Sequence, residues 1–440
     1  MADADGELRV AAGYDVNSLT IEYYARLKGS KDWILLKKNA GRDRETFEIL
    51  GFDPERPNEL FILTNNGEDK ASIYSMDIST QKLTEKLFGV KSADAYGIMT
   101  SRKTGKSGQL LGFIYITSKV KRIFIDEAEK ALYKAVNGLF PYEQSTMISR
   151  SDDDNAIIVR IQGPKDPGTY YLLKDKSKLT FIGSSFPMIK PENLAKQKFV
   201  RYKARDGRKI PAYLTIPNGE GPFPTVVMPH GGPWAQDFPG YDEWTHVLAN
   251  NGYLVIQPQY RGSTGFGLDH WKAGDKKWGY EMQDDLDDGA EYLVKKGLAD
   301  KDRLAMFGWS YGGYAAFVGS MRKNNIYKCT IAGAGVSDMD RISAQLFTSK
   351  IQGATVKGLS PLKHVEDVNV PILIIHGDID QRVNVYHSRA FVKKLKEYNK
   401  EYKYVELKGA DHFSNTLFYD HKKHLYTEIL GWLENTCFKK

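Results

Sequence analysis

Ser310 stands in the stretch FGWSYGGYAAF (307–317), where Gly308, Ser310 and Gly312 have the spacing G-x-S-x-G. In this pattern the serine occupies a strained turn between a strand and a helix, and the glycines leave room for close approach of the backbone. The strain exposes the hydroxyl, and the backbone N–H of Tyr311 then points to where a carbonyl oxygen would become negative. The pattern predicts a nucleophilic serine.

The flanking residues supply the context that such a turn requires. RLAMF (303–307) has the apolar character of a short buried strand, and YAAFVGSM (314–321) has the small and apolar residues of a buried helix. A serine at a strand-to-helix junction is therefore favoured over the alternative, a hydroxyl in an ordinary glycine-rich loop.

A serine hydroxyl becomes a good nucleophile only when a base takes its proton and a carboxylate orients that base. On a parallel sheet these groups follow later strands, in the order serine, acid, histidine. The predicted strand PILIIHG (371–377) leads to Asp378 and Asp380, and the strand YKYVEL (402–407) leads to His412. The order is met, and the residues alone leave both aspartates open as the acid.

The developing oxyanion needs a second donor, usually a backbone N–H from the loop after an early strand. MPHGGPWA (228–235) fits this requirement, since Gly231 and Gly232 let the backbone approach a substrate. We expect Gly232 to act with Tyr311, and Gly231 stays open as a donor.

The first 190 residues consist of short alternating runs separated by turn residues, with no helical period of useful length. This pattern predicts an all-β unit. The runs are LTIEYYARL (19–27), DWILLKK (32–38), ELFILT (59–64), SIYSMD (72–77), KRIFID (121–126), AIIVRI (156–161) and TYYLLKD (169–175).

A weak repeat runs through this part of the chain. Asp77, Asp126 and Asp175 each end a predicted strand, and they lie 49 residues apart. A leucine follows each of them, at positions 83, 132 and 179. Repeats of about 40 to 50 residues are typical of propeller blades of four strands. A plain antiparallel sandwich is the alternative.

The rhythm changes at PMIKPENLAKQKFVRYKARDGRKIPAYL (187–214), where a short link leads into a hairpin. Strands then alternate with helices to the end of the chain, which predicts an α/β fold whose mostly parallel sheet carries helices on both faces. We therefore expect a partial β-propeller-like domain over residues 1–190 and an α/β-hydrolase domain over residues 191–440.

Composition excludes several classes of protein. The 440 residues are 27% charged with a net charge of +7, but the cations are scattered among 55 acidic residues, so we expect no nucleic-acid partner. The start of the chain resembles no signal peptide, and no apolar run approaches the roughly 20 residues of a membrane span. With two cysteines, at positions 329 and 437, no disulfide framework is implied. We expect a soluble, cytoplasmic protein.

No cofactor and no metal are expected. The acidic run EMQDDLDDGAEYL (281–293) is interpreted as a solvated helix, because carboxylates in the first half of a helix are favoured by its dipole. His230 and His376 lie at strand ends, where packing or hydrogen bonding to other groups explains them better than metal ligation. SDDDN (151–155) is interpreted as a hairpin turn.

Five motifs together resemble the prolyl oligopeptidase family of serine peptidases, most closely its acylaminoacyl-peptidase and dipeptidyl-peptidase branches. The resemblance covers about residues 191–440, and it implies hydrolysis of short peptides through an acyl-enzyme. The motifs are HGGP (230–233), QYRGSTGFG (259–267), GWSYGGY (308–314), HGDIDQRV (376–383) and GADHF (409–413).

The resemblance also assigns residues that spacing alone leaves open. In this family the acid stands two residues before an Arg-Val pair, which implies Asp380 as the acid. The arginine of that pair, Arg382, would bind a backbone carbonyl of the substrate. Val336 and Met339 would line the pocket for an apolar side chain.

Members of this family carry a propeller of seven or eight blades, whereas 190 residues hold about four blades of this length. Either the propeller is shortened or its first blades lie in sequence absent here. Two other functions stay open, a carboxylesterase on the same triad and an inactive binding scaffold. Assembly into a homo-oligomer also stays open.

Overall fold

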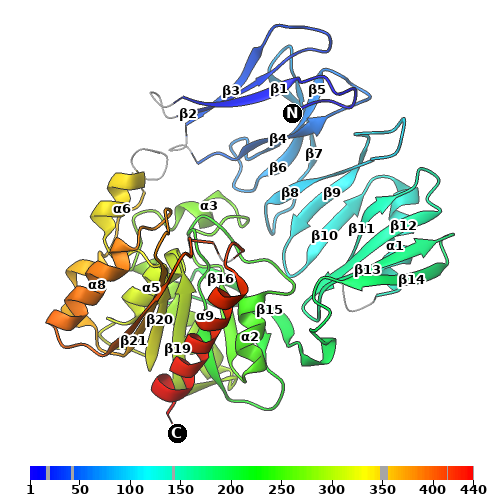
Figure 1. Ribbon diagram of the computed structural model, residues 1–440. Helices are drawn as coiled ribbons and strands as arrows, with labels where there is room; N and C mark the ends of the chain where they lie inside the picture. Colours follow the sequence, from blue (N-terminus) through cyan, green and yellow to red (C-terminus); the bar gives the residue numbers. More distant parts are fainter. Residues whose placement is uncertain (16–19, 41–43, 141–143, 347–354, 414, 440) are drawn as a thin grey trace.

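The computed structural model describes residues 1–15, 20–40, 44–140, 144–346, 355–413 and 415–439. Within these ranges the chain forms several small antiparallel sheets followed by one large mixed sheet covered by helices (Figure 1). The small sheets fan out along the upper and right-hand side of the view, and the large sheet lies below them.

The small sheets build the first half of the chain. Their orders are β1-β2-β3, β4-β5-β6-β7, β10-β9-β8 and β11-β12-β13-β14, with antiparallel neighbours throughout. Each sheet is formed by consecutive strands, as in the blades of a propeller. The strands are Val10–Asp15, Thr20–Ala25, Ile34–Ala40, Phe47–Phe52, Glu59–Thr64, Ser72–Asp77, Lys82–Phe88, Ala95–Thr100, Leu110–Ile116, Val120–Phe124, Gln144–Arg150, Ala156–Gly163, Asp166–Lys174 and Lys178–Ser184.

The repeat in the sequence follows the third strand of successive sheets. Asp77 ends β6, Asp126 comes two residues after β10, and Asp175 directly follows β13. The structure therefore places the three aspartates at equivalent turns, and the prediction of blade-like repeats is confirmed for these sheets. The run 151–155 is the turn between β11 and β12, as expected.

The expectation of no helix in this half was wrong. Helix α1 (Glu127–Gly138) takes the place of a fourth strand in the sheet of β8, β9 and β10. The Asp126 side chain caps it by accepting a hydrogen bond of 2.8 Å from the Glu129 N–H. Only Glu129 and Val136 are buried on this helix, although its apolar residues do recur with a helical period. The capping aspartate and this period were the signals available in the sequence.

The large sheet has the order β15-β16-β18-β17-β19-β20-β21-β22. Strands β15, β16 and β18 pair antiparallel, and all pairs from β18 to β22 are parallel. The strands are Lys196–Lys203, Lys209–Ile216, Phe223–Val227, Leu254–Pro258, Ala299–Trp309, Cys329–Gly333, Ile372–Gly377 and Tyr402–Leu407. The last small sheet ends at Ser184 and β15 begins at Lys196, on either side of the predicted boundary.

Helices cover both faces of this sheet, as predicted. Alternate residues of each central strand pack on opposite faces, so that Leu304 and Met306 of β19 belong to one apolar cluster and Ala305 and Phe307 to the other. Residues of α4, α5 and α8 complete the first cluster, and residues of α2 and α9 the second. The helices are α2 Glu243–Asn250, α3 Leu268–Lys272, α4 Glu281–Lys295, α5 Tyr311–Gly319, α6 Met339–Leu346, α8 Tyr386–Glu397 and α9 Tyr419–Trp432.

The acidic helix α4 is not solvated, which corrects the interpretation from sequence. Asp285 is fully buried and forms an ion pair of 2.7 Å with Arg261. Asp287 lies 3.0 Å from Arg322 and accepts a hydrogen bond of 2.8 Å from the Tyr327 hydroxyl. Both arginines lie outside the helix in the sequence, so the sequence of the helix alone does not show that its aspartates are paired.

Burial raises the pKa of Asp287 to about 6, although Arg322 acts in the opposite direction. Because this pKa exceeds the unfolded value, folding favours the protonated carboxyl, and its stabilisation is present below about pH 4 and lost as the pH rises through 6. We expect Asp287→Asn to flatten the pH dependence of the free energy of unfolding in this window, by about 2–3 kcal/mol. Urea titrations from pH 4 to 7 measure this, and the exposed Asp302→Asn is the control. An unchanged slope would contradict the assignment.

Cys329 and Cys437 form a disulfide, which corrects the expectation that the two cysteines imply none. Cys329 begins β20, and Cys437 ends the turn of helix that follows α9. Their Cα atoms lie 5.2 Å apart, and the bond closes a sequence separation of 108 residues. The bond therefore ties the end of the chain to the centre of the large sheet.

Removing this crosslink should destabilise the protein by releasing the unfolded chain from a long loop constraint. We expect Cys437→Ala to lower the free energy of unfolding by about 2–4 kcal/mol. Denaturation with and without reductant measures the effect, and the variant should be insensitive to the reductant. Two titratable thiols in the untreated native protein would contradict the prediction.

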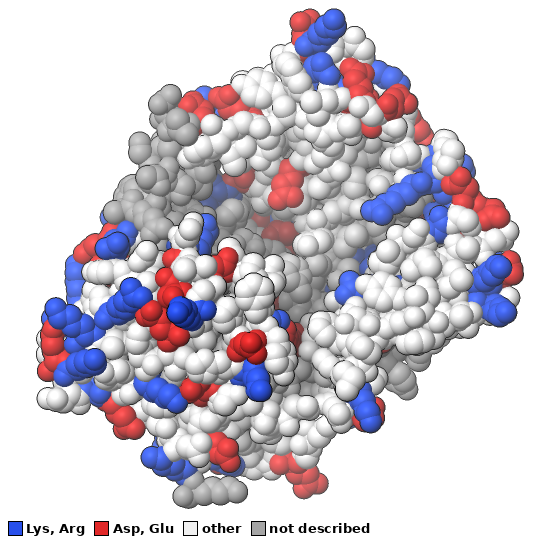
Figure 2. All heavy atoms as spheres, viewed as in Figure 1, with Lys and Arg blue, Asp and Glu red and all other residues white. Residues whose placement is uncertain are grey.

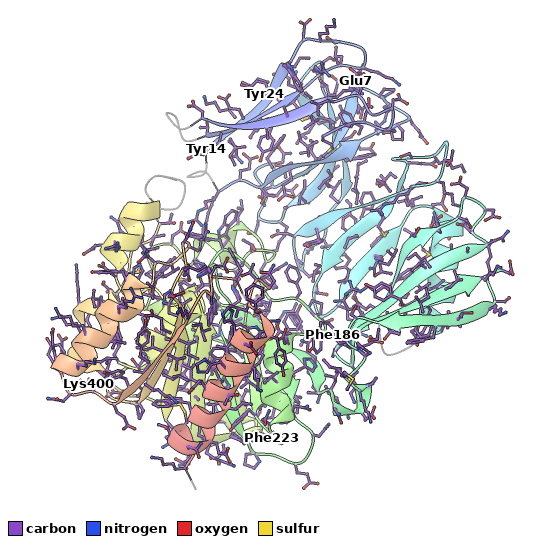
Figure 3. The ribbon with its side chains drawn as sticks, in the orientation of Figure 1. Glu7, Tyr14, Tyr24, Phe186, Phe223 and Lys400 are labelled. Carbon is purple, nitrogen blue, oxygen red and sulfur yellow. A yellow bond between two sulfur atoms is a disulfide. The ribbon has the colours of Figure 1, made fainter. Side chains whose placement is uncertain are left out.

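The two halves touch through polar and aromatic contacts. Phe186, labelled in Figure 3 where the last small sheet meets the large one, packs against Tyr241 with ring centroids 5.9 Å apart. Arg44 is buried in the seam, where it pairs with Asp275 at 2.6 Å and lies over the ring of Trp234. The first half therefore contacts the loop that follows β17.

The surface is hollowed between the two halves, and on the face shown cationic and anionic residues are interspersed (Figure 2). A pocket of about 450 Å³ lies on this seam, and Phe199, Tyr213 and Phe238 are among the residues that line it. None of the helices within the described ranges combines the length and apolar character that crossing a membrane requires.

Candidate active site

Ser310 lies between the end of β19 and the first residue of α5, the junction that its motif requires. Its φ of +62° is a left-handed conformation that side chains other than glycine rarely adopt. The Ser310 N–H donates to the carbonyl of Gly333 at 2.9 Å, which helps to hold the turn. A Cβ on Gly308 would lie 2.5 Å from backbone atoms of Gly312, so only glycine fits there.

Asp380 and His412 are brought together from the loops after β21 and β22. The His412 Nδ1 lies 2.6 Å from Asp380 Oδ2, and both side chains are buried. Because a carboxylate only accepts, Nδ1 carries the proton and Nε2 is the free basic nitrogen. The pair has the polarity of a general base with its orienting acid.

The rest of the Asp380 carboxylate is also fully bonded. Its Oδ1 accepts hydrogen bonds of 2.8 Å from the backbone N–H groups of Arg382 and Val383. Burial opposes ionisation, but hydrogen bonds from His376 and His412 hold the pKa of Asp380 well below its usual range. The carboxylate is thus anionic at neutral pH.

Asp378, the competing aspartate, makes a different contact. Its Oδ1 accepts from the N–H of Gly409 at 2.5 Å, which links the two loops ahead of His412. Its side chain is bonded to backbone and not to the imidazole. The geometry therefore separates the two aspartates, which spacing alone could not do.

In the described part of the chain, the Ser310 hydroxyl and the His412 ring form no hydrogen bond. The neighbouring Trp309 indole does donate to the His412 carbonyl, at 2.8 Å, so the histidine loop is bonded to the residue that precedes the serine. Such catalytic bonds are often long in ligand-free structures and tighten when substrate binds.

The expected oxyanion donors lie around Ser310. Tyr311 opens α5, and a first-turn N–H has no acceptor within its own helix. Gly231 approaches the serine so closely that a Cβ on it would lie 3.4 Å from Ser310 Cβ. Gly232 has a φ of +126° and continues the same loop. Which of the two glycines donates remains a prediction.

Aromatic rings support this region. Tyr260 stacks between His230 and Tyr311, with ring centroids 4.5 Å and 5.2 Å away. Its hydroxyl donates to the His230 carbonyl at 2.8 Å. Burial lowers the pKa of His230 to about 4, so this ring is neutral at pH 7. The His230 ring therefore helps to hold the loop that carries Gly231, in agreement with the packing role expected from its place at a strand end.

The residues predicted to bind substrate have different environments. Val336 and Met339 are buried and belong to the same apolar cluster as Tyr311. Arg382 is exposed beside the acid, and its backbone is held by Asp380. Val336 follows β20 and Met339 opens α6, whereas Arg382 lies in the loop after β21.

His376 is hydrogen-bonded to other groups, as its place near a strand end indicated, but the sequence did not show that it lies beside the acid. It is the last residue but one of β21, and its Nε2 lies 3.3 Å from Asp380 Oδ2. The available signal was its position in the sequence, near the end of the strand and four residues before Asp380.

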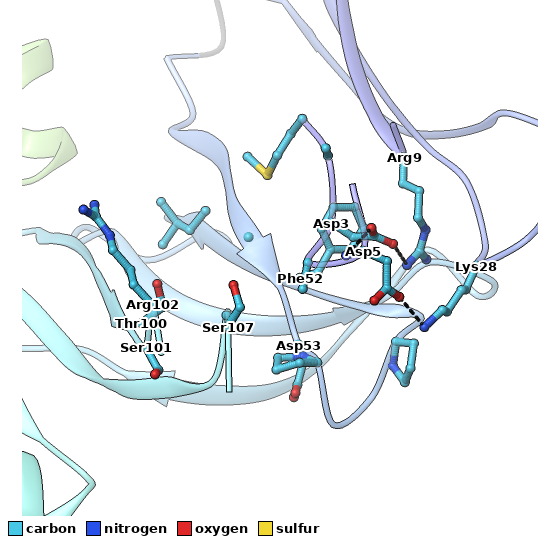
Figure 4. A pocket seen from close by; sticks show the side chains of 18 of the residues that line it. Asp3, Asp5, Arg9, Lys28, Phe52, Asp53, Thr100, Ser101, Arg102 and Ser107 are labelled. Atoms are coloured by element: carbon cyan, nitrogen blue, oxygen red, sulfur yellow. Dashed lines mark hydrogen bonds and ion pairs between the residues drawn. The ribbon is translucent and has the colours of Figure 1, made fainter. Parts of the chain in front are cut away.

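Another pocket, of about 550 Å³, lies among the small sheets and is lined by the chain start and the loops after β4 and β8 (Figure 4). Its carboxylates are paired, Asp3 with Arg9 at 3.2 Å and Asp5 with Lys28 at 2.8 Å. It belongs to the first half of the chain and not to the site around Ser310.

Over the described ranges, no group of three or more His, Cys, Asp or Glu residues is arranged to hold a metal ion.

Comparison with known proteins agrees with this geometry. The sequence profile of the prolyl oligopeptidase family matches residues 239–440. These residues form a prolyl oligopeptidase family domain.

Relatives of this prolyl oligopeptidase domain include curated peptidases. The chain is 29% identical to dipeptidyl aminopeptidase BIII of Pseudoxanthomonas mexicana, over 91% of this chain and 63% of that protein. It is 26% identical to dipeptidyl peptidase family member 6 of Caenorhabditis elegans, over 85% of this chain and 56% of that one. The chain thus spans less than two thirds of either relative.

Solved structures resemble the chain in both halves. A puromycin-hydrolyzing peptidase of Mycobacterium tuberculosis matches with a TM-score of 0.75 at 19% identity, over 100% of this chain and 69% of that one. The acylaminoacyl peptidase of Pyrococcus horikoshii matches with a TM-score of 0.72 at 18% identity, over 98% and 69%. The likeness establishes the fold, an α/β-hydrolase domain preceded by propeller-like sheets.

The two aspartates should respond differently to loss of charge. We expect Asp380→Asn to lower kcat/KM about 10³- to 10⁴-fold, because the amide no longer fixes the His412 tautomer or stabilises its imidazolium. Asp378→Asn should leave turnover near the parent value, since it contacts only backbone. Steady-state kinetics on the pair measures this, and equal losses would contradict the assignment of Asp380.

Proposed function

We propose that the chain is a serine peptidase that cleaves short peptides through an acyl-enzyme. The observation that carries this proposal is the bonded Asp380–His412 pair, whose histidine carbonyl accepts a hydrogen bond from the indole of Trp309, the residue before Ser310 on its strained turn. The family of the domain and the names of its relatives support the same reaction class.

In the proposed mechanism, the Ser310 oxygen attacks the scissile carbonyl while His412 Nε2 takes the hydroxyl proton. The oxyanion accepts hydrogen bonds from the N–H of Tyr311 and from Gly232, with Gly231 as the other candidate. As the C–N bond breaks, the imidazolium gives its proton to the leaving amine. Water then attacks the ester by the same route in reverse, and Asp380 stabilises each imidazolium.

We assign substrate contacts to Arg382, Val336 and Met339. The exposed guanidinium of Arg382 can donate to a backbone carbonyl, and the two apolar side chains suit an apolar residue at the acyl position. The name of one relative, dipeptidyl aminopeptidase BIII, supports short peptides with a free amino terminus as the substrates that we propose for this chain. We also place a domain boundary at residues 190 and 191.

The Cys329–Cys437 disulfide bears on the compartment in which this peptidase works. Disulfides persist in oxidising surroundings and are rare in the cytosol. The bond therefore favours an oxidising compartment over the cytoplasm that we expected from composition.

The decisive experiment compares a free-amine dipeptidyl anilide with the ester of the same acyl group. We expect the purified protein to cleave both, and Ser310→Ala to remove essentially all turnover because the nucleophile is lost while the fold stays intact. Measured kcat/KM values for both substrates test this.

Cleavage of the ester alone would leave the triad active but exclude the peptidase, in favour of a carboxylesterase. An absence of both activities, together with failure to react with a fluorophosphonate, would indicate the binding scaffold. Full activity in the Ser310→Ala protein would refute the nucleophile.

A further inference from the structure

We propose that His376 is a positioning residue for the reaction, one that holds the Asp380 carboxylate in the orientation that His412 requires. This inference rests on the proposed function, since it assigns a role within the same site. It concerns a ring that touches no substrate and acts only through Asp380.

The contacts of His376 define its protonation state. Its ring is fully buried, and Nε2 lies 2.8 Å from the carbonyl oxygen of Val383. A carbonyl only accepts, so Nε2 carries the proton. Nδ1 lies 2.7 Å from the Ser388 Oγ, whose hydroxyl therefore donates to the ring. This N–H bonds Val383, and the Nε2 atom that carries it also lies 3.3 Å from Asp380 Oδ2.

This arrangement gives Asp380 Oδ2 two imidazole neighbours. His412 approaches at 2.6 Å and His376 at 3.3 Å, whereas Oδ1 is held by two backbone N–H groups. Three donors bond this buried carboxylate, His412 at Oδ2 and two backbone N–H groups at Oδ1, and the His376 ring packs against Oδ2 on its other side. Rotation of the carboxylate would break bonds on both sides.

His376 also fixes the loop that bears the acid. By bonding the Val383 carbonyl it holds the segment whose N–H groups bond Asp380 Oδ1. The ring connects β21 to this loop and, through Ser388, to α8. A purely packing role would require only a ring of the same size, and this role requires the N–H.

Removal of the N–H should also change the titration of the site. The charged and titratable groups around the ring are Asp380, His412, Glu406 of β22 and His387 of α8. Without the polar N–H group that lies 3.3 Å from it, the negative charge on Oδ2 is less stabilised and attracts the His412 imidazolium more strongly. The acidic limb of kcat/KM should then move to higher pH.

The test compares His376→Phe, which keeps a ring but loses the N–H, with His376→Gln, whose amide N–H can reach the same acceptors. We expect His376→Phe to lower kcat about ten- to hundredfold with little change in KM. The acidic limb of its kcat/KM profile should move to higher pH. His376→Gln should restore most of the rate and the parent pH profile. His376→Asn, whose amide stops short of the carboxylate, replaces His376→Phe if the latter does not fold.

His246→Phe is the matched control, because it removes another buried imidazole that contacts two backbone carbonyls, those of Asp242 and Pro164. It should keep the parent pH profile. If His376→Phe behaves as this control does, or if glutamine fails to rescue a well-folded protein, the positioning role is refuted.

The rate of reaction with a fluorophosphonate is measured on the same variants, since it requires an activated serine but no peptide. A parent protein that reacts with the fluorophosphonate and cleaves no peptide would refute the proposed peptidase, while the variants still test His376. The positioning role is supported if the His376→Phe protein reacts slowly while the His376→Gln and His246→Phe proteins react at the parent rate, whether peptide cleavage or fluorophosphonate labelling is measured.

Discussion

The site depends on how closely the backbone packs where β19 passes into α5. Ser310 adopts a left-handed conformation there, and Gly308 and Gly312 touch their neighbours without space for a side chain. A central parallel strand can bear such a turn because β17 and β20 bond it on both sides. The sheet thus stabilises the strained turn, and the turn presents the hydroxyl at the side of the sheet where the parallel strands have their carboxyl ends.

That edge explains why residues far apart in the chain meet. Parallel strands β17, β19, β21 and β22 end on the same side of the sheet, so each of their loops contributes one component of the proposed site. The glycine loop comes from the first, the serine from the second, and Asp380 and His412 from the last two. Buried donors then fix the carboxylate more firmly than a solvated turn would allow.

The sequence predicted whatever depends on local pattern. The strand-to-helix turn at Ser310, the alternation of strands and helices and the 49-residue interval were all visible in it, because period and glycine spacing are properties of neighbouring residues. Contacts between distant segments were not visible. The Asp285–Arg261 pair, the disulfide and the bond from His412 to Asp380 each join residues through the fold. Helix α1 was missed although its Asp126 cap and its apolar period are local signals, because it stands among runs that alternate as strands do.

Arg44 connects the first half of the chain directly to a loop of the proposed active site. Its guanidinium lies over Trp234, which stands two residues after Gly232 in the loop assigned to the oxyanion, and it is paired with Asp275. Any shift of the first half relative to the second must move this contact. The free energy of docking the two halves and the order of the oxyanion loop are therefore linked quantities, so that a substrate that orders the loop also tightens the association of the domains.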